Sequence, residues 1–384
     1  MNKKTIIYIG AFELPDKDAA AHRVLNNAKI FKKLGYNVVF SDVNRSKSIS
    51  LDLNKKRIIK GFEVWSREFP TTSKKWLHYL ISINEIKKII KEYSNVDIII
   101  AYNYQSFALF NLLNFCKKNN IKLISDCTEW YEDKRAIKKL DTTFRMRYLH
   151  KRIDGIICIS DYLRDYYKKY VKTIVIPPLI DAEEEKWEKT DSNNQEIIKF
   201  IYSGNPGKHK DKLNLVIEAF HTIQKDKKNF NFTIVGLEEE EYLQYYPEHK
   251  ELLDTVRKNV IFVGRVNHSK SLEYVKKSDF QIFIRENKRV NNAGFPTKFV
   301  ESMGCRTPVI TTNTSDLAKY LIPNVNGFFV EEDAEISKIL KKIINLSFQE
   351  INKMKRNCNA IENFDFHEFI VPTHEFLSYI NEKR

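Results

Sequence analysis

The sequence predicts an α/β protein of two Rossmann-like domains, with parallel sheets that face a central cleft. Three observations carry this prediction. Short apolar runs rich in Ile and Val alternate with helix-length amphipathic segments, the alternation occurs twice, and a polar, acidic stretch separates the two series. A length of 384 residues also fits two cores better than one.

The first series lies within residues 1–180, which we expect to form the N-terminal domain. Its predicted strands are Thr5–Gly10, Val38–Ser41, Asp97–Tyr102, Ile121–Ser125, Gly155–Ser160 and Thr173–Ile176. Between the first two strands, the pattern over Ala20–Leu34 predicts a helix that ends at Gly35.

Residues 181–196 carry no strand pattern, and we expect them to be a linker. The second series then predicts a C-terminal domain over residues 197–366. Its strands are Lys199–Ser203, Phe232–Val235, Val260–Val263, Phe280–Ile284, Val309–Thr311 and Gly327–Val330. A last helix over residues 367–384 can pack on either domain, including back on the N-terminal one.

Charge and composition restrict the classes of partner. The net charge of +14 favours anionic partners, and no aromatic-basic motif supports nucleic acid among them. Five cysteines without a CxxC pair predict neither a disulfide framework nor a structural zinc. No window approaches the roughly 20 apolar residues of a membrane span, and no cleavage site follows the N-terminal apolar run. We therefore expect a cytoplasmic protein.

The loop after Lys199–Ser203 has the features of an anion site. It begins at Gly204, contains Lys208 and Lys210, and precedes a predicted helix. Free N–H groups at a helix start bind anions, and lysines there oppose the helix dipole unless an anion is bound. An exposed lysine-rich turn is the alternative.

The loop after Phe280–Ile284 holds a second such arrangement. Pro296 suits the first turn of a helix that ends at Gly304, and Lys298 and Glu301 share one face of it. The helix start can bind a diphosphate, while a carboxylate can accept hydrogen bonds from both hydroxyls of a ribose. A plain surface ion pair between Lys298 and Glu301 is the alternative.

These residues resemble those of a known family, the retaining GT-B glycosyltransferases of family four. Ala293–Ile310, with its GFPTK sequence, resembles the family's donor-site motif, and Gly204–Ala219 resembles its phosphate-binding segment. Ile156–Leu163 resembles the end of the N-terminal domain, Ile176–Asp181 the crossover between domains, and Gly10–Gly35 the first loop and helix. The resemblance covers nearly the whole chain in the expected order.

The resemblance implies roles for these residues. Glu301 would hold the nucleotide ribose, Lys210 would neutralise the departing diphosphate, and Thr297 and Lys298 would line the phosphate and sugar pocket. The implied donor-binding residues are Gly10, Gly204, Asn205, Lys208, Lys210, Arg285, Thr297, Lys298 and Glu301. The nucleotide-sugar is a substrate, and no metal or other cofactor is expected, because lysines and helix-end N–H groups replace the metal.

Two positions depart from the family pattern. The first of the family's two glutamates would fall at Ala293, which cannot bond a sugar hydroxyl, although Glu286 or Asn292 could substitute. The family's phosphate-loop arginine would fall at Asn205. Three nearby cations can supply that charge: Lys208, Arg285 and Arg289.

The N-terminal domain is expected to bind the acceptor. Asp126 and Glu129 follow a predicted strand and are candidate catalytic residues that orient the acceptor, while Trp130 can stack on a sugar. His22 and Arg23 are further acceptor-binding candidates. The alternatives are a helix cap at Asp126, a buried Trp130, and a simple helix start at His22 and Arg23.

Lys134–Arg152 holds eight Lys or Arg residues against one acid, Asp141, with apolar residues between them. A basic amphipathic segment can lie on an anionic membrane, although a solvated helix face is the alternative. The combined prediction is a transferase that moves sugar from a nucleotide-diphosphate sugar to a glycan or lipid-linked acceptor during synthesis of a surface polysaccharide or glycolipid. It would act on the inner face of the membrane. A relative that binds nucleotide-sugar without efficient turnover is the alternative.

Overall fold

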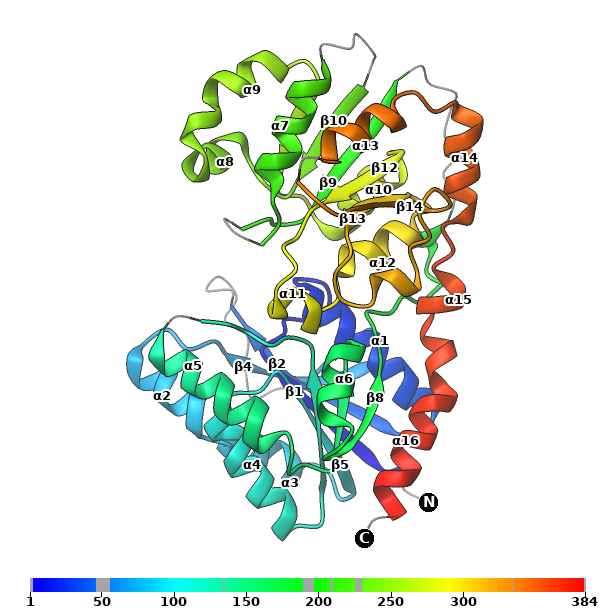
Figure 1. Ribbon diagram of the computed structural model, residues 1–384. Coiled ribbons are helices and arrows are strands. Elements are labelled where there is room, and N and C mark those ends of the chain that lie inside the picture. The colour runs from blue at the N-terminus through cyan, green and yellow to red at the C-terminus, as the bar shows by residue number, and fades with distance from the viewer. Residues whose placement is uncertain are drawn as a thin grey trace. The chain divides into compact units, whose positions relative to one another are not determined.

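The computed structural model describes residues 3–45, 56–133, 135–188, 197–207, 210–224, 230–333 and 335–382 (Figure 1). The chain divides into two compact units. Unit 1 comprises Met1–Leu179, Ala293–Phe295 and Phe366–Arg384, and unit 2 comprises Ile180–Asn292 and Pro296–Asp365.

The described strands of unit 1 form one sheet in the order β3-β4-β2-β1-β5-β6-β7-β8. They are β1 (Thr5–Gly10), β2 (Asn37–Asn44), β3 (Arg57–Ile59), β4 (Phe62–Glu68), β5 (Val96–Tyr102), β6 (Lys122–Cys127), β7 (Gly155–Cys158) and β8 (Lys172–Val175). The helices are α1 (Ala19–Lys33), α2 (Ser73–Ile81), α3 (Asn84–Lys91), α4 (Ser106–Lys118), α5 (Ala136–Phe144), the π-helical turn η1 (Arg145–Leu149), α6 (Asp161–Tyr167), η6 (Phe366–Phe369) and α16 (Ile370–Glu382).

The β3–β4 hairpin is a feature that the sequence prediction missed. Lys60 and Gly61 both have positive φ, as a two-residue hairpin turn requires. β4 is buried only at alternate positions, with Glu63 and Arg67 among the others, so it lacks the continuous apolar run of the neighbouring strands. β4 pairs in parallel with β2, whereas β3 is antiparallel to β4.

The C-terminal helix α16 belongs to the core of unit 1. Phe376 and Ile380 pack in one hydrophobic cluster with residues of the sheet and of α1. Gly155 on β7 leaves the room for this contact, because a Cβ there would lie 2.5 Å from Ile380 Cδ1. The last helix therefore packs on the N-terminal sheet, one of the two placements that the sequence allowed.

The described strands of unit 2 form a parallel sheet in the order β11-β10-β9-β12-β13-β14. They are β9 (Ile198–Ser203), β10 (Phe230–Val235), β11 (Val260–Gly264), β12 (Phe280–Phe283), β13 (Val309–Thr312) and β14 (Gly327–Val330). The helices are η2 (Glu185–Trp187), α7 (Leu213–Ile223), α8 (Glu239–Tyr245), η4 (Pro247–His249), α9 (Lys250–Val256), α10 (His268–Lys276), α11 (Arg289–Ala293), α12 (Thr297–Gly304), η5 (Leu317–Lys319), α13 (Glu335–Ile343), α14 (Phe348–Asn357) and α15 (Ile361–Phe364).

Both units are thus Rossmann-like, with parallel strands joined by helices, as the sequence predicts. Within the described ranges, no helix is both long enough and apolar enough to cross a bilayer.

Candidate active site

In the sheet of unit 2, the direction in which successive strands are added reverses between β9 and β12. β10 and β11 continue on one side of β9, while β12, β13 and β14 continue on the other. In open parallel sheets, ligands bind beyond the carboxyl ends of the strands at such a switch point. The loops after β9 and β12 meet there, and the Lys212 N–H donates to the Ile284 carbonyl at 2.8 Å.

A buried carboxylate, Asp211, holds two cations at this switch point. Its Oδ2 accepts hydrogen bonds from Lys298 Nζ at 2.6 Å and from the Tyr202 hydroxyl at 2.7 Å. Its Oδ1 accepts from Arg285 Nε at 2.7 Å. Lys298 Nζ also donates to the Tyr202 hydroxyl at 2.9 Å. One carboxylate therefore orients two cations, and the group keeps an excess of one positive charge.

Burial sets the ionisation of this group. Burial lowers the pKa of the Lys298 ammonium to about 8; Asp211 opposes this shift, whereas Arg285 and Lys210 add to it. Burial also opposes ionisation of Asp211, but the charges of Lys298 and Arg285 outweigh it and hold the pKa of that carboxyl below its ordinary value. Lys298 is thus a cation that titrates near neutral pH and gains from a further anion.

The phosphate-loop residues lie beside Lys298. Gly204 has a φ of +126°, and a Cβ there would lie 3.3 Å from Lys298 Nζ, so glycine leaves space next to the ammonium. Asn205 Oδ1 accepts a hydrogen bond from the Gly207 N–H at 2.8 Å and shapes the turn. Lys210 is exposed, and its charge reaches Lys298. The predicted Lys208 lies outside the described residues.

Two helices begin at this edge without a capping side chain. The first turn of α7 follows Lys212, and that of α12 follows Pro296; neither N-cap side chain makes a hydrogen bond to the helix. Thr297 opens α12, and Lys298 follows it. Uncapped first-turn N–H groups next to buried cations are suited to bind the oxygens of a phosphate.

Glu301 lies one turn further along α12. Its Oε1 is 2.9 Å from His268 Nε2, at the start of α10. His268, Asp211 and Tyr202 are site residues that were not predicted from the sequence. Asp211 directly follows Lys210, so only its position in the phosphate loop could have drawn attention to it.

Ala293 stands at the position where the family has its first glutamate, and this position is not accessible to a ligand. Ala293 is fully buried, and its carbonyl accepts a hydrogen bond from Ser160 Oγ at 2.8 Å within unit 1. Glu286 pairs with Lys288. Asn292 bonds to Asn287 at 2.6 Å and to the Ser315 N–H at 3.0 Å. Both proposed substitutes therefore have partners in this conformation.

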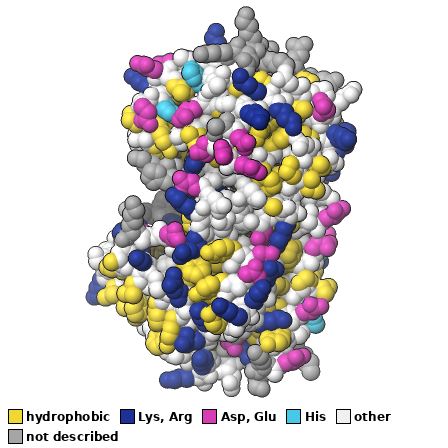
Figure 2. Space-filling view, in the orientation of Figure 1, with side chains coloured by type: hydrophobic (Ala, Val, Ile, Leu, Met, Phe, Trp, Pro, Cys, Tyr) yellow, Lys and Arg dark blue, Asp and Glu magenta, His cyan; other side chains and the backbone are white. Residues whose placement is uncertain are grey.

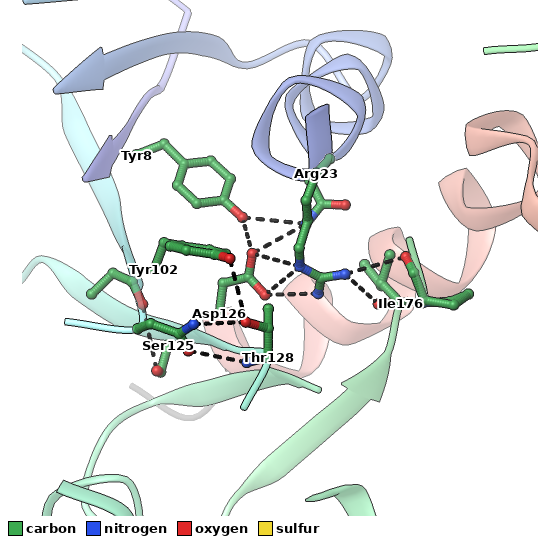
Figure 3. A network of polar contacts seen from close by, with 11 residues as sticks. Tyr8, Arg23, Tyr102, Ser125, Asp126, Thr128 and Ile176 are labelled. Carbon is green, nitrogen blue, oxygen red and sulfur yellow. Dashed lines mark hydrogen bonds and ion pairs between the residues drawn. The ribbon is translucent and has the colours of Figure 1, made fainter. Parts of the chain in front are cut away.

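In unit 1, Asp126 and Arg23 form a buried ion pair (Figure 3). Arg23 Nη2 lies 2.7 Å from Asp126 Oδ1, and Tyr8 donates its hydroxyl to Asp126 Oδ2 at 2.5 Å. Arg23 Nη1 also donates to the Ile176 carbonyl at 2.8 Å. The pair ties α1 and β6 to the segment after β8. Asp126 is not a helix cap. Both side chains are buried, so neither is assigned to the proposed site.

The other candidates of unit 1 lie after β6, in α1 and at the end of β1. Trp130 is buried and packs edge-on against Tyr166, as its structural alternative predicts. His22 lies partly buried in the first turn of α1, and Glu129 is partly buried after β6. Gly10 ends β1, where a Cβ would lie 2.9 Å from Phe12 and Tyr102 side-chain atoms.

Only part of the basic segment that follows residue 134 is exposed to solvent. Arg145 is buried and donates to the carbonyls of Asn103 and Tyr104 at 3.1 Å. Asp141, the one acid, accepts a hydrogen bond from the Ser106 N–H at 2.8 Å and thereby caps α4. Among the described residues of the segment, the exposed face is therefore cationic and apolar, while Arg145 is structural. Residue 134 is not described.

Two family models match the chain. Residues 20–184 match the model described as Glycosyltransferase Family 4, and residues 182–362 match that of Glycosyl transferases group 1. No curated protein matches the chain in sequence.

Solved structures have the same fold at low sequence identity. A glycosyltransferase from Rickettsia africae ESF-5 is 16% identical with a TM-score of 0.71, and both chains are covered in full. Sucrose-phosphate synthase from Thermosynechococcus elongatus is 13% identical with a TM-score of 0.76, again over both full chains. HepE from Anabaena, solved with UDP, is 16% identical with a TM-score of 0.69, over 98% of this chain and 100% of that one.

The two family matches together extend from residue 20 to residue 362, and each falls on one of the two Rossmann-like units. The chain therefore belongs to the GT-B glycosyltransferases.

Proposed function

We propose that this protein is a retaining glycosyltransferase that moves a sugar from a nucleotide-diphosphate sugar to a glycan or lipid-linked acceptor. The observation that carries the proposal is the Asp211-held pair of Lys298 and Arg285 at the switch point of unit 2, beside two uncapped helix starts. The pair has an excess positive charge in a site shaped for phosphate oxygens.

The donor diphosphate would bind at this cationic edge. In the reaction, the bond between the anomeric carbon and the diphosphate oxygen breaks, and an acceptor oxygen bonds to the same face of the sugar. The leaving diphosphate takes the bonding electrons and accepts the acceptor's proton. Lys298, Arg285 and Lys210 stabilise the charge that develops on it, and they do so best where water is excluded.

Glu301 is the proposed ribose ligand. A carboxylate accepts hydrogen bonds from two vicinal hydroxyls, and the contact with His268 fixes its rotamer. HepE from Anabaena has been solved with UDP-glucose, which supports a nucleotide-sugar donor in this fold. We also propose that transfer needs no metal ion, so full activity in a chelator is expected.

A catalytically weak relative that binds nucleotide-sugar without efficient turnover is the second candidate. Ala293 favours it, because it stands where the family has a sugar-binding glutamate and its side chain is buried. Binding experiments do not separate the two candidates. Release of nucleoside diphosphate in the presence of acceptor does.

Two substitutions test the assignment of the site. We expect Glu301→Ala to weaken nucleotide binding about tenfold or more, because hydrogen bonds to a charged group are lost. We expect Lys210→Ala to slow transfer roughly a hundredfold with a smaller effect on binding. Lys258→Ala removes an exposed lysine of the same unit and is the control. Activity at the wild-type level in both site variants contradicts the assignment.

We further propose that unit 1 docks on an anionic membrane through α4 and α5. Phe107 and Phe110 of α4 are 51% and 41% exposed, and Ile137 and Leu140 of α5 are 82% and 63% exposed. Figure 2 shows hydrophobic side chains gathered over these helices, with lysines and arginines among them. Apolar side chains enter the interface of a bilayer while the cations contact anionic headgroups.

Vesicle flotation tests this surface. Charge reversal of Lys138, Lys139 and Arg147 together should abolish binding to phosphatidylglycerol vesicles, since each contributes about 1 kcal/mol. Arg145 is excluded because it is buried. The control reverses three exposed lysines of unit 2, Lys250, Lys258 and Lys353. Equal loss in both triple variants, or no loss in the first, overturns the proposal.

A further inference from the structure

The sheet of unit 1 has a switch point of its own, between β1 and β5. β2 and β4 continue on one side of β1, and β5 continues on the other. The loops after β1 and β5 follow Gly10 and Tyr102, at the edge where ligands of such sheets bind. The ion pair of Arg23 and Asp126 links α1, β6 and the segment after β8. A different arginine lies at this edge.

Arg67, near the carboxyl end of β4, contacts both loops. Its Nη2 donates to the Gly10 carbonyl at 3.4 Å, and its Nη1 donates to the Tyr104 hydroxyl at 3.4 Å. Both distances exceed the usual range for an N–H donor. Its guanidinium lies over the ring of Tyr79, with 5.4 Å between its central carbon and the ring centroid. Arg67 Nε is shielded from solvent and makes no hydrogen bond among the described residues.

Arg67 itself is half-buried, and the buried arginines have stronger partners. Arg23 and Arg285 each pair with a carboxylate at 2.7 Å. Arg145 donates to two carbonyls at 3.1 Å. Asp42, the carboxylate whose charge acts on Arg67, instead accepts hydrogen bonds from Ser66 and from the Leu14 N–H. Within the described ranges, Arg67 forms no ion pair.

A shielded Nε–H without an acceptor is costly, since this N–H has lost water and gained no hydrogen bond in return. A guanidinium has five N–H donors, and Arg67 uses two of them in long bonds. The planar fork of a guanidinium matches the paired oxygens of a phosphate or a carboxylate. The aromatic ring and the tyrosine hydroxyl beside it suit an anionic group carried by a sugar or a lipid.

We propose that Arg67 binds an anionic group, phosphate or carboxylate, on the acceptor. This inference rests on the proposed transferase function and specifies the acceptor class. The acceptor would be a phosphorylated glycan or lipid, or a glycan ending in a uronic acid. Arg67 would position it at the switch point of unit 1.

Calorimetric titration tests the proposal, with the donor site saturated by whichever of UDP, GDP and ADP binds the protein. Inorganic phosphate and glucuronate are the two probes, and they distinguish a phosphate from a sugar carboxylate. Arg67→Gln should weaken binding of the preferred probe at least tenfold. Arg67→Lys keeps the charge without the fork and should give an intermediate affinity. Arg164→Gln is the control, because Arg164 is an arginine of unit 1 that pairs with Asp161 and Asp165.

The outcomes separate this inference from the proposed function. Weaker binding of the probe by Arg67→Gln supports the inference, provided that its nucleotide affinity is unchanged and that Arg164→Gln binds the probe like wild type. The inference is overturned if wild type and Arg67→Gln bind each probe with the same affinity. It is also overturned if wild type binds neither phosphate nor glucuronate. If none of UDP, GDP and ADP binds wild type, the proposed function fails. Arg67→Lys decides the question if Arg67→Gln does not fold.

Discussion

At the residue scale, the donor site depends on a carboxylate that would not contact the donor. Asp211 separates two like charges, Lys298 and Arg285, and fixes both side chains beside the phosphate loop. A diphosphate arriving there meets cations whose rotamers are already set. Less conformational entropy is then lost on binding than with free surface lysines.

Asp211→Asn should therefore cost about 3–5 kcal/mol of unfolding free energy, because it leaves two buried cations without their counter-charge. Urea denaturation measures this cost. Asp333→Asn removes the partner of Lys212 in an exposed pair, and should cost less than about 1 kcal/mol. Similar costs for the two variants would show that the Asp211 cluster contributes no more than a surface pair.

Lys298 should make donor binding depend on pH. Its pKa is about 8 in the free protein, and a bound diphosphate raises it, so the complex holds a proton that the free protein loses above pH 8. Affinity for the nucleoside diphosphate should be near its maximum at about pH 7 and fall by up to tenfold per unit above about pH 8. Calorimetry in two buffers of different ionisation enthalpy should detect the proton uptake at pH 8.5. Lys298→Arg should bind without this dependence; a wild-type affinity that stays constant to about pH 9.5 would rule out titration of Lys298.

The residues that the sequence identified and those that it missed differ for a physical reason. Lys298 and Glu301 lie on one helix, so helical spacing predicts their common face. Asp211 and Lys298 are 87 positions apart, and their contact depends on how β9 and β12 pair. The same holds for Arg23 and Asp126, which are 103 positions apart and form a pair that local pattern could not predict.

At the element scale, long apolar runs gave accurate boundaries. β1 spans Thr5–Gly10 as predicted, and α12 begins one residue after Pro296. The sequence also predicted two α/β series, because each buried parallel strand has a run of Ile and Val. The β3–β4 hairpin was missed because its half-buried strands mix charged and apolar residues.

The docking of α16 on the first sheet can be tested through Gly155. A side chain at this position collides with Ile380, so Gly155→Ala should cost about 1–3 kcal/mol. Ile380→Ala alone should cost about 2–5 kcal/mol. Because the second change makes room for the first, the double variant should cost less than the sum of the two in urea denaturation. Additive costs would contradict the contact.

At the scale of the whole molecule, each Rossmann-like unit presents an arginine at its switch point, and the two differ in their partners. Arg285 is held by Asp211 in unit 2, whereas Arg67 of unit 1 forms no ion pair with a described residue. The excess of positive charge, +14 over the chain, is consistent with anionic substrates in both units. In our account unit 2 binds the donor and unit 1 the acceptor.

The identity of the sugar, the base and the acceptor could not be predicted from the sequence. One methyl or hydroxyl group in a pocket changes specificity, and the family's first sugar-binding glutamate is replaced by the buried Ala293. A screen of nucleotide-sugars addresses this directly.

The most direct test is release of nucleoside diphosphate from a panel of UDP-, GDP- and ADP-sugars. We predict that one nucleoside diphosphate raises the melting temperature, and that wild type releases it from the matching sugar donor. Lys298→Ala should lose both effects. If no nucleotide in the panel shifts the melting temperature and none is released, the assignment of unit 2 as a donor site is wrong.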